Sequence, residues 1–297
     1  MHELLTTEEA ADHLRVSERK LYELVASGSV PCSKVTGRWV FPKAALDRWV
    51  MSGLSGGPAA AHAVPPAIVG GSHDPLLEWA LRESGSGLAG LPEGSESGLR
   101  RLTRRELMAA AIHLHRPEDE KDNARTNIDV VAQTPGLHDA ALIGFARREQ
   151  GLLVAAGNPR GLDGLTTVVR TKARLAPRTD GAGAQLLLLA MMQQMKLPPE
   201  RLHIVGPPCV TALDIAQAIR AARADCGIGT RAVAQATGIG FVPLVWEWFD
   251  IVVRQRDYFR PEMQTLFAFL RRPQFADRAR ELGGYDIGET NRVRFAT

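Results

Sequence analysis

Residues 53–66 separate two parts of the chain whose patterns of apolar and polar residues differ, so the chain is expected to fold as more than one domain. The segment reads GLSGGPAAAHAVPP and contains no charged side chain and no periodic apolar pattern. Gly, Ala, Ser and Pro in this mixture favour irregular backbone, flexible at the glycines and stiffer near Pro65 and Pro66. The sequence therefore predicts a linker over residues 53–66, with one domain at 1–52 and another at 67–297.

The part before the linker predicts two short helices, a hairpin and a third helix. A threonine cap and early acids predict a helix that opens at Thr7, and Ser17 is expected to cap a second helix that Gly28 ends. Residues 30–42 contain β-branched and aromatic residues around a central Thr-Gly, which indicates a hairpin. Two helices, a tight turn and a hairpin in this order are typical of winged helix-turn-helix DNA readers.

Residues 4–50 resemble the excisionase and MerR-like winged-helix family. The matching features are a TxxEAAxxL opening, the segment VSxRxLYxLVxSG, a GRW in the hairpin and a final LxxW. The resemblance implies binding to a double-stranded DNA operator, with Arg19 at a base edge in the major groove and the hairpin on the flanking backbone or minor groove. The residues expected to contact DNA are Ser17, Arg19, Lys20, Tyr22, Lys34 and Arg38. The formal net charge of +3 is too small to predict DNA binding without this local pattern.

After the linker, short apolar strands alternate with helices that begin at Gly-, Ser- or Thr-rich turns. The expected strands are residues 67–69, 87–91, 108–113, 142–145, 152–155, 203–205, 226–228 and 241–244. Alternation of this kind predicts an α/β fold with a mostly parallel sheet and helices on both faces.

Residues 68–285 resemble the type II periplasmic-binding-protein-like domains that are fused to helix-turn-helix regulators, relatives of molybdate-binding proteins. Short segments carry the resemblance in order, among them GSHD at 71–74, GSESGL at 94–99, ADCGIG at 224–229 and FVPL at 241–244. The resemblance implies two lobes with a ligand cleft between them. The expected lobes are residues 67–146 with 254–297, and residues 150–246, and the chain is expected to cross between them at 147–150 and 247–253.

Four of the turns that open helices are expected to bind a small anion in this cleft. Free backbone N–H groups and the helix dipole favour a negative group, and Ser or Thr hydroxyls add donors. The same residues are also ordinary N-caps, so a purely structural role stays open. Arg178 would neutralise ligand charge, and His113 would donate a hydrogen bond. The residues expected to contact the ligand are Ser72, His73, Ser95, His113, Arg178, Thr179, Gly181, Gly183 and Thr211.

By resemblance, the favoured ligand is molybdate or tungstate, and a small organic carboxylate such as formate is the alternative. An anion-binding accessory protein of cofactor biosynthesis is an alternative of a different class. The one GxSxG match, GLSGG at residues 53–57, lies in the predicted linker and not at a strand-to-helix turn. No HExxH or P-loop motif occurs, so we do not expect an enzyme. His113 and His115 share one face of a strand, but no third ligand stands at a supporting spacing, so neither a metal nor a cofactor is expected.

The sequence also limits where the protein acts and how it assembles. The N-terminus MHELLTTEEA lacks the apolar segment of a secretory signal, and no apolar run is long enough to span a membrane. Cys32, Cys209 and Cys226 lie far apart, as expected for reduced thiols. We therefore expect a cytoplasmic protein with no membrane partner. Because one winged helix offers a small DNA contact, we also expect a homodimer or larger assembly.

Overall fold

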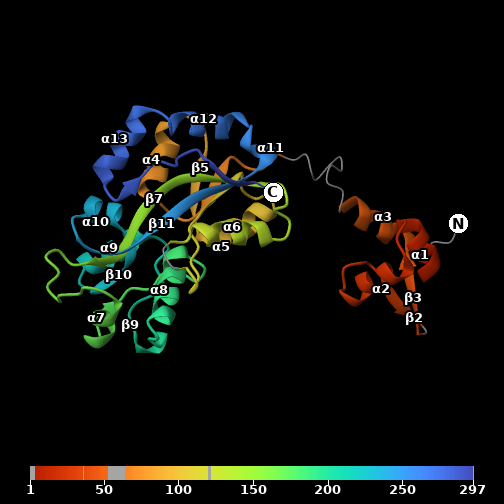
Figure 1. Ribbon diagram of the computed structural model, residues 1–297, viewed down its shortest axis with the longest axis horizontal. Helices are drawn as coiled ribbons and strands as arrows, with labels where there is room; N and C mark the ends of the chain where they lie inside the picture. Colours follow the sequence, from red (N-terminus) through yellow and green to blue (C-terminus); the bar gives the residue numbers. More distant parts are fainter. Residues whose placement is uncertain (1–3, 36, 53–63, 120–121, 297) are drawn as a thin grey trace. The chain divides into compact units, whose positions relative to one another are not determined.

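The computed structural model describes residues 4–35, 37–52, 64–119 and 122–296, drawn as a ribbon in Figure 1. The chain divides into two compact units, Met1–Val64 and Pro65–Thr297. Of the predicted linker, residues 53–63 lie outside the described residues, as does Thr36 of the predicted hairpin. None of the described helices is long and apolar enough to cross a membrane.

The first unit contains three helices and a three-stranded antiparallel sheet. Its elements are β1 (Leu4–Leu5), α1 (Thr7–Leu14), α2 (Glu18–Ala26), β2 (Ser33–Val35), β3 (Arg38–Pro42) and α3 (Lys43–Ser52). Thr6 begins α1 through a capping box with Glu9, and Ser17 caps α2 by accepting a hydrogen bond from the Lys20 N–H at 3.2 Å. The sheet order β1-β3-β2 places the β2–β3 hairpin at one edge, as the wing of a winged helix-turn-helix requires. The predicted class of this unit is therefore confirmed.

The second unit is a mixed α/β domain. Its strands are β4 (Ile68–Gly71), β5 (Ala89–Pro92), β6 (Ala109–Ile112), β7 (Ala140–Val154), β8 (Arg174–Leu175), β9 (His203–Ile204), β10 (Cys226–Thr230), β11 (Gly240–Arg254), β12 (Tyr285–Asp286) and β13 (Val293–Ala296). Its helices are α4 (Pro75–Glu83), α5 (Ser95–Thr103), α6 (Ala124–Gln133), α7 (Leu165–Arg170), α8 (Gly183–Gln194), α9 (Ala212–Arg220), α10 (Arg231–Thr237), α11 (Gln255–Tyr258), α12 (Pro261–Phe269) and α13 (Pro273–Leu282), with a short 3-10 turn at Pro199–Arg201.

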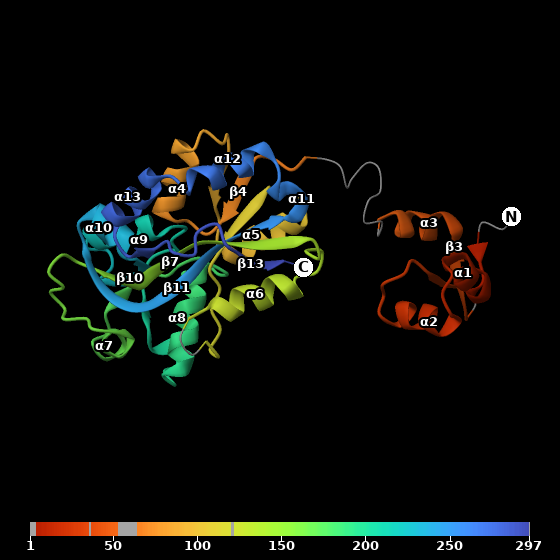
Figure 2. The same cartoon turned by 45° about the horizontal axis from the view of Figure 1, so that its top comes forward.

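Two long antiparallel strands, β7 and β11, join the two lobes of this unit. The sheet order is β5-β4-β6-β11-β7-β10-β8-β9, and β12 and β13 also pair with β7. Near one end, β11 pairs with β6 of the first lobe, while near the other end β7 pairs with β10 of the second lobe. Figures 1 and 2 show both strands running through the unit, with α4, α12 and α13 above them and α7 and α8 below.

The long strands correct two details of the sequence prediction. The sheet is mixed and not mostly parallel, because β7 pairs antiparallel with β10, β11, β12 and β13, and β11 pairs antiparallel with β6. Residues 142–145 and 152–155 were expected to be separate strands, but β7 runs without a break from Ala140 to Val154. In the same way, β11 includes both the expected strand 241–244 and the expected crossing 247–253. The polar residues that interrupt the apolar pattern lie inside the strands, because their side chains bond to one another at the junction of the lobes.

Each lobe has apolar clusters against more than one group of helices, as expected for a sheet covered on both faces. In the first lobe, one cluster includes Leu76, Leu266 and Phe275, and the other includes Leu99, Leu102 and Val131. In the second lobe, the clusters include Leu165, Leu187 and Leu188, and Ile215, Ile219 and Val233. Apart from Ala232 of α10, which joins the first of these clusters, the buried residues of each cluster lie within one lobe or in the shared strands. This arrangement would let one lobe move against the other around those strands.

Candidate functional site

A small cavity lies where the two lobes meet. Its volume is about 10 Å³, space for no more than about one water molecule. It is lined by His73, Pro75, His113, Arg148, Gln150, Arg178, Ala212, Gly229, Thr230 and Val233. Pro75 begins α4 of the first lobe and Ala212 begins α9 of the second, so helix N-termini from both lobes reach this cavity.

The carboxylate of Glu247 organises the buried polar groups beside the cavity. Glu247 lies on β11 and is fully buried. Its Oε2 faces His113 Nδ1 at 3.0 Å and His115 Nε2 at 2.7 Å. Its Oε1 accepts hydrogen bonds from Arg148 Nε at 2.7 Å and from Gln150 Nε2 at 3.0 Å. One carboxylate therefore fixes four side chains, two from the segment that follows β6 and two from β7.

These contacts also decide which groups are charged. Burial would raise the pKa of Glu247, but His113, Arg148 and the hydrogen bonds of the histidines hold that pKa well below its usual range. Burial lowers the pKa of His113 to about 4, and this effect outweighs the attraction of Glu247. At neutral pH, Glu247 is therefore ionised and His113 is uncharged.

Arg148 connects this carboxylate to a second one. Its Nη1 lies 2.7 Å from Asp74 Oδ2, and the Tyr285 hydroxyl donates to the same oxygen at 2.9 Å. The other oxygen of Asp74 caps α4 by accepting from the N–H groups of Leu76 and Leu77. The buried Arg148 guanidinium is thus neutralised by two carboxylates, and it has little charge left to attract a ligand.

Arg178 is buried like Arg148, but the described hydrogen-bond partners of its guanidinium are backbone carbonyls and not carboxylates. Its guanidinium is largely buried and donates to backbone carbonyls, from Nε to Cys209 at 3.1 Å and from Nη2 to Val210 at 2.6 Å. Among the residues that the structure describes, no carboxylate lies within ion-pair distance of it. Burial lowers the pKa of Arg178 to about 10, and the nearby Arg148 acts in the same direction, yet the side chain stays protonated at neutral pH. The cavity therefore has a positive charge without a counter-ion among the described residues.

Gln150 lines the same cavity and carries a buried acceptor. Because Glu247 Oε1 can only accept, the amide of Gln150 must turn its NH₂ toward it. The amide oxygen, Oε1, is buried and has no hydrogen-bond partner among the described residues. An unsatisfied buried acceptor costs about 1–3 kcal/mol, so a donor at this position would stabilise the closed arrangement.

The predicted serines do not face the cavity as free donors. The hydroxyls of Ser72 and Ser95 bond to each other at 2.8 Å. Ser95 Oγ also accepts from the His113 N–H at 3.1 Å and lies 3.2 Å from the His113 carbonyl oxygen. These bonds use the single hydroxyl proton of each serine within the protein. In this conformation the serines hold the start of α5 against the end of β6.

Gly181 and Gly183 form the contact between the lobes at this point. The Glu96 N–H donates to the Gly181 carbonyl at 3.2 Å, and a Cβ at Gly183 would lie 2.0 Å from the His113 carbonyl oxygen. A side chain at Gly183 would therefore force the lobes apart. These two predicted residues contribute by allowing close approach.

The remaining predicted ligand residues lie in different surroundings. Thr211 caps α9, and its hydroxyl lies 2.9 Å from Asp214 Oδ2, as in an ordinary capping box. Thr179 is half-buried, and its N–H donates to the Cys209 carbonyl at 3.2 Å. Of the nine residues expected to bind the ligand, the cavity thus brings together His73, His113 and Arg178.

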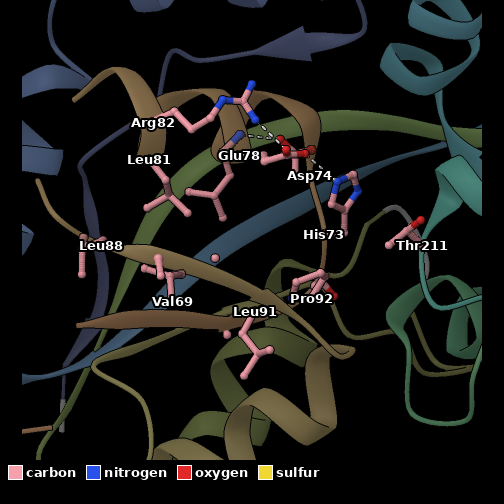
Figure 3. A pocket seen from close by; sticks show the side chains of 15 residues that line it. Val69, His73, Asp74, Glu78, Leu81, Arg82, Leu88, Leu91, Pro92 and Thr211 are labelled. Carbon is pink, nitrogen blue, oxygen red and sulfur yellow. Dashed lines mark hydrogen bonds and ion pairs between the residues drawn. The ribbon is translucent and has the colours of Figure 1, made fainter. Parts of the chain in front are cut away.

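A larger pocket lies under α4, next to the edge strand β5. It has a volume of about 420 Å³, and Figure 3 shows Val69, Leu81, Leu88 and Leu91 along it. Thr211 lines this pocket too. Its charged groups pair with one another: Glu78 contacts His73 Nε2 at 3.0 Å and Arg82 at 2.6 Å. An apolar surface with two acidic side chains, Asp74 and Glu78, does not suit an anion.

His113, His115 and Glu247 have ligand atoms within 4.8 Å of one another, a spacing at which they could hold a metal ion. The sequence had offered the two histidines without a third ligand, and the fold supplies Glu247. However, the guanidinium of Arg148 already brings a positive charge to this carboxylate at 2.7 Å. We therefore interpret the group as a hydrogen-bonded centre that positions the walls of the cavity.

Sequence reasoning missed Arg148, Gln150 and Glu247. The signal was present as RREQ at residues 147–150 and as a single acid between Trp246 and Trp248, each inside an otherwise apolar strand. A polar group in a buried strand requires partners, but the partner of Arg148 lies 99 positions further along the chain. Only the fold reveals that pairing.

In the first unit, the exposed side of α2 carries the residues predicted to contact DNA. The Arg19 side chain is 90% exposed, and its Nε lies 3.5 Å from Glu23 Oε1. Lys20 and Tyr22 are also exposed, while Ser17 caps the helix. On the hairpin, Lys34 pairs across the strands with Trp39, and Arg38 is exposed. The geometry leaves these cations available to a large anionic partner.

Comparisons with known proteins agree with the two-unit architecture. Residues 4–53 match the family described as a helix-turn-helix domain, and residues 77–271 match the PBP superfamily domain. The chain is 23% identical over 307 residues to the uncharacterized protein YvgK of Bacillus subtilis. The aligned region covers 98% of each of the two chains.

Among solved structures, the chain is similar to a mutant of OxyR from Corynebacterium glutamicum bound to hydrogen peroxide. That match has a TM-score of 0.50 at 12% identity and covers 93% of this chain and 89% of that one. The sulfate-binding protein SubI from Mycobacterium tuberculosis also has a TM-score of 0.50 at 12% identity, covering 73% of this chain and 84% of that one. At these identities, the likeness shows a shared fold.

Proposed function

The chain belongs to the PBP superfamily, and on that premise we propose that it is a transcription regulator that binds operator DNA and senses a small anion. An N-terminal helix-turn-helix domain joined to a binding-protein fold is the architecture of a ligand-binding, DNA-binding regulator. The proposal is a binding function without catalysis, exercised in the cytoplasm, where the DNA is. The helix-turn-helix unit would supply specificity, and the larger unit would supply the response.

The observation that carries the anion proposal is the buried guanidinium of Arg178 at the cavity between the lobes. A buried charge is costly unless it is paired, and no described carboxylate pairs with Arg178. An anion in the cleft would provide that pair. The N-terminus of α9 reaches the same cavity, and the positive end of its dipole favours the same ligand charge.

Several small anions satisfy this charge requirement. The resemblance of the sequence puts molybdate and tungstate first, with formate as the carboxylate alternative. SubI is a sulfate-binding protein of the same fold, but its low identity indicates nothing further about the ligand of this chain. The charge of Arg178 attracts all of these anions, so discrimination must come from the neutral groups around it.

The geometry also supports a way for ligand binding to affect DNA binding. A cavity of about 10 Å³ cannot admit an anion unless the lobes separate around β7 and β11. A ligand that binds the two lobes would then shift the open and closed populations by its differential affinity for them. We propose that the protein acts as a homodimer, in which closure changes the spacing of two DNA-binding units. Light scattering should then give twice the mass of the chain.

Thermal unfolding of the full-length protein with a panel of anions tests the anion proposal. Molybdate, tungstate, sulfate, phosphate, formate and glycolate should be compared at equal ionic strength, because a ligand that binds only the folded state raises the melting temperature. At least one should raise it for the wild type, and Arg178→Gln should abolish that rise.

Arg170→Gln is the matched control, since it removes the same charge from an exposed position on α7 of the same lobe. It should leave the rise unchanged. Equal responses of the wild type and Arg178→Gln to every anion would contradict the assignment of the site.

A further inference from the structure

We infer that the anion bound between the lobes carries a hydrogen-bond donor of its own, an O–H or N–H group that reaches the amide oxygen of Gln150. The inference rests on the proposed function and narrows its ligand. The class it names comprises protonated oxyanions, such as hydrogen phosphate, and small carboxylates with a hydroxyl or amino group.

The first step is the fixed orientation of Gln150. The side chain is almost completely buried, and its Nε2 is held by Glu247 Oε1 at 3.0 Å. Arg148 Nε donates to that same carboxylate oxygen at 2.7 Å, which keeps the carboxylate in place. The amide cannot turn over without placing two acceptors against each other. Its Oε1 is thus committed to accept, and no described protein group donates to it.

The second step is the presence of another acceptor at the same cavity. His113 Nδ1 must carry the proton that it donates to Glu247 Oε2, because a carboxylate oxygen only accepts. Burial holds the pKa of His113 near 4, so the ring is neutral and its Nε2 retains a lone pair. The imidazole lines the cavity together with Gln150 and Arg178. One cation and two acceptor groups therefore border a single small space.

These groups discriminate against anions that have no hydrogen-bond donor. A fully deprotonated anion, such as sulfate, molybdate, tungstate, formate or acetate, pairs with Arg178 but offers nothing to Gln150 Oε1. No described protein group donates to this oxygen in place of the ligand. A site whose buried polar group stays unpaired discriminates strongly against the ligand that lacks the donor. Protonated oxyanions and hydroxy acids therefore rank ahead of molybdate and tungstate.

Titration calorimetry on the full-length protein at pH 7 tests this with two pairs of anions. Phosphate carries an O–H where sulfate carries none, and glycolate carries a hydroxyl that acetate lacks. In at least one pair, the anion with the donor should bind roughly ten- to a hundredfold more tightly than its partner. The pair that shows the preference distinguishes an oxyanion ligand from a carboxylate ligand.

Gln150→Met then tests which residue is responsible. It removes the acceptor at nearly constant volume and should reduce the preference toward equality, whereas Gln133→Met, at an exposed position on α6, should retain it. The wild-type preference decides the inference even if Gln150→Met fails to fold.

The outcomes separate the two proposals. If sulfate binds through Arg178 at least as tightly as phosphate, and acetate at least as tightly as glycolate, the inference is overturned and the anion proposal stands. If no anion binds, or if binding survives Arg178→Gln unchanged, the proposed function itself fails.

Discussion

The arginines of the two units show how burial and partners decide what a charge can do. Arg19 on α2 is 90% exposed and has a loose ion pair with Glu23 at 3.5 Å. Arg148 on β7 is 1% exposed and is held by two carboxylates, each at 2.7 Å. Arg178 combines burial with the lack of a described carboxylate partner. The same guanidinium is therefore free to meet DNA in one place, structural in another, and available to a small anion in the third.

Among the arginines, removal of the buried Arg148 should cause the largest loss of stability. Arg148→Met removes the cation and leaves Asp74 and Glu247 buried without it. Breaking a buried ion pair by removing one partner costs about 3–5 kcal/mol, so urea unfolding should show a loss of this size.

Arg160→Met is the matched control, because Arg160 forms an ion pair with Asp225 at 3.0 Å but is 42% exposed. It should cost about 0–1 kcal/mol. If the two variants lose similar stability, the buried network contributes no more than a surface pair does.

The uncharged state of His113 predicts a dependence of stability on pH. Its pKa is about 4 in the folded protein, against an ordinary value of 6.5. The unfolded chain therefore binds the proton more readily, so stability is insensitive to His113 above pH 6.5 and falls as the pH drops from 6.5 toward 4. At pH 5 the loss relative to pH 8 should be about 2 kcal/mol.

Urea unfolding at several pH values measures this loss. His113→Asn should flatten the dependence between pH 6.5 and 4, whereas His138→Asn, at an exposed position, should not. An unchanged slope in His113→Asn would show that the proton is taken up elsewhere.

Arg19 is the exposed arginine, and Arg19→Ala should leave the free energy of unfolding nearly unchanged, because surface ion pairs contribute little. Operator binding should weaken by roughly 1–3 kcal/mol with a relaxed base preference, since Arg19 is expected at a base edge. Lys34→Ala should instead weaken all sequences about equally and reduce the salt dependence, as expected for a phosphate contact.

Selection of binding sites from random DNA, followed by anisotropy titrations at several salt concentrations, measures both effects. If both variants bind the selected site like the wild type, α2 and the hairpin do not read DNA.

Local patterns in the sequence were enough to predict the features that depend on neighbours along the chain. The class of each unit, the cap at Ser17 and the alternation of strands and helices all follow from local patterns, and the structure and the family matches confirm the two classes. Arg178 could be proposed as a ligand residue because an arginine beside a Gly-rich helix start is itself a local signal.

Which polar groups contact one another depends on how distant parts of the chain pack together. Residues 147–150 and Glu247 read as breaks in apolar strands, because their partners lie about a hundred positions away. Ser72 and Ser95 read as anion donors, but the fold brings their hydroxyls together and uses them within the protein. A hydrogen bond depends on distances of a few tenths of an ångström, and long-range packing sets those distances. The sequence could therefore propose donors for the cleft, whereas the unsatisfied acceptor Gln150 Oε1 emerged only from the folded chain.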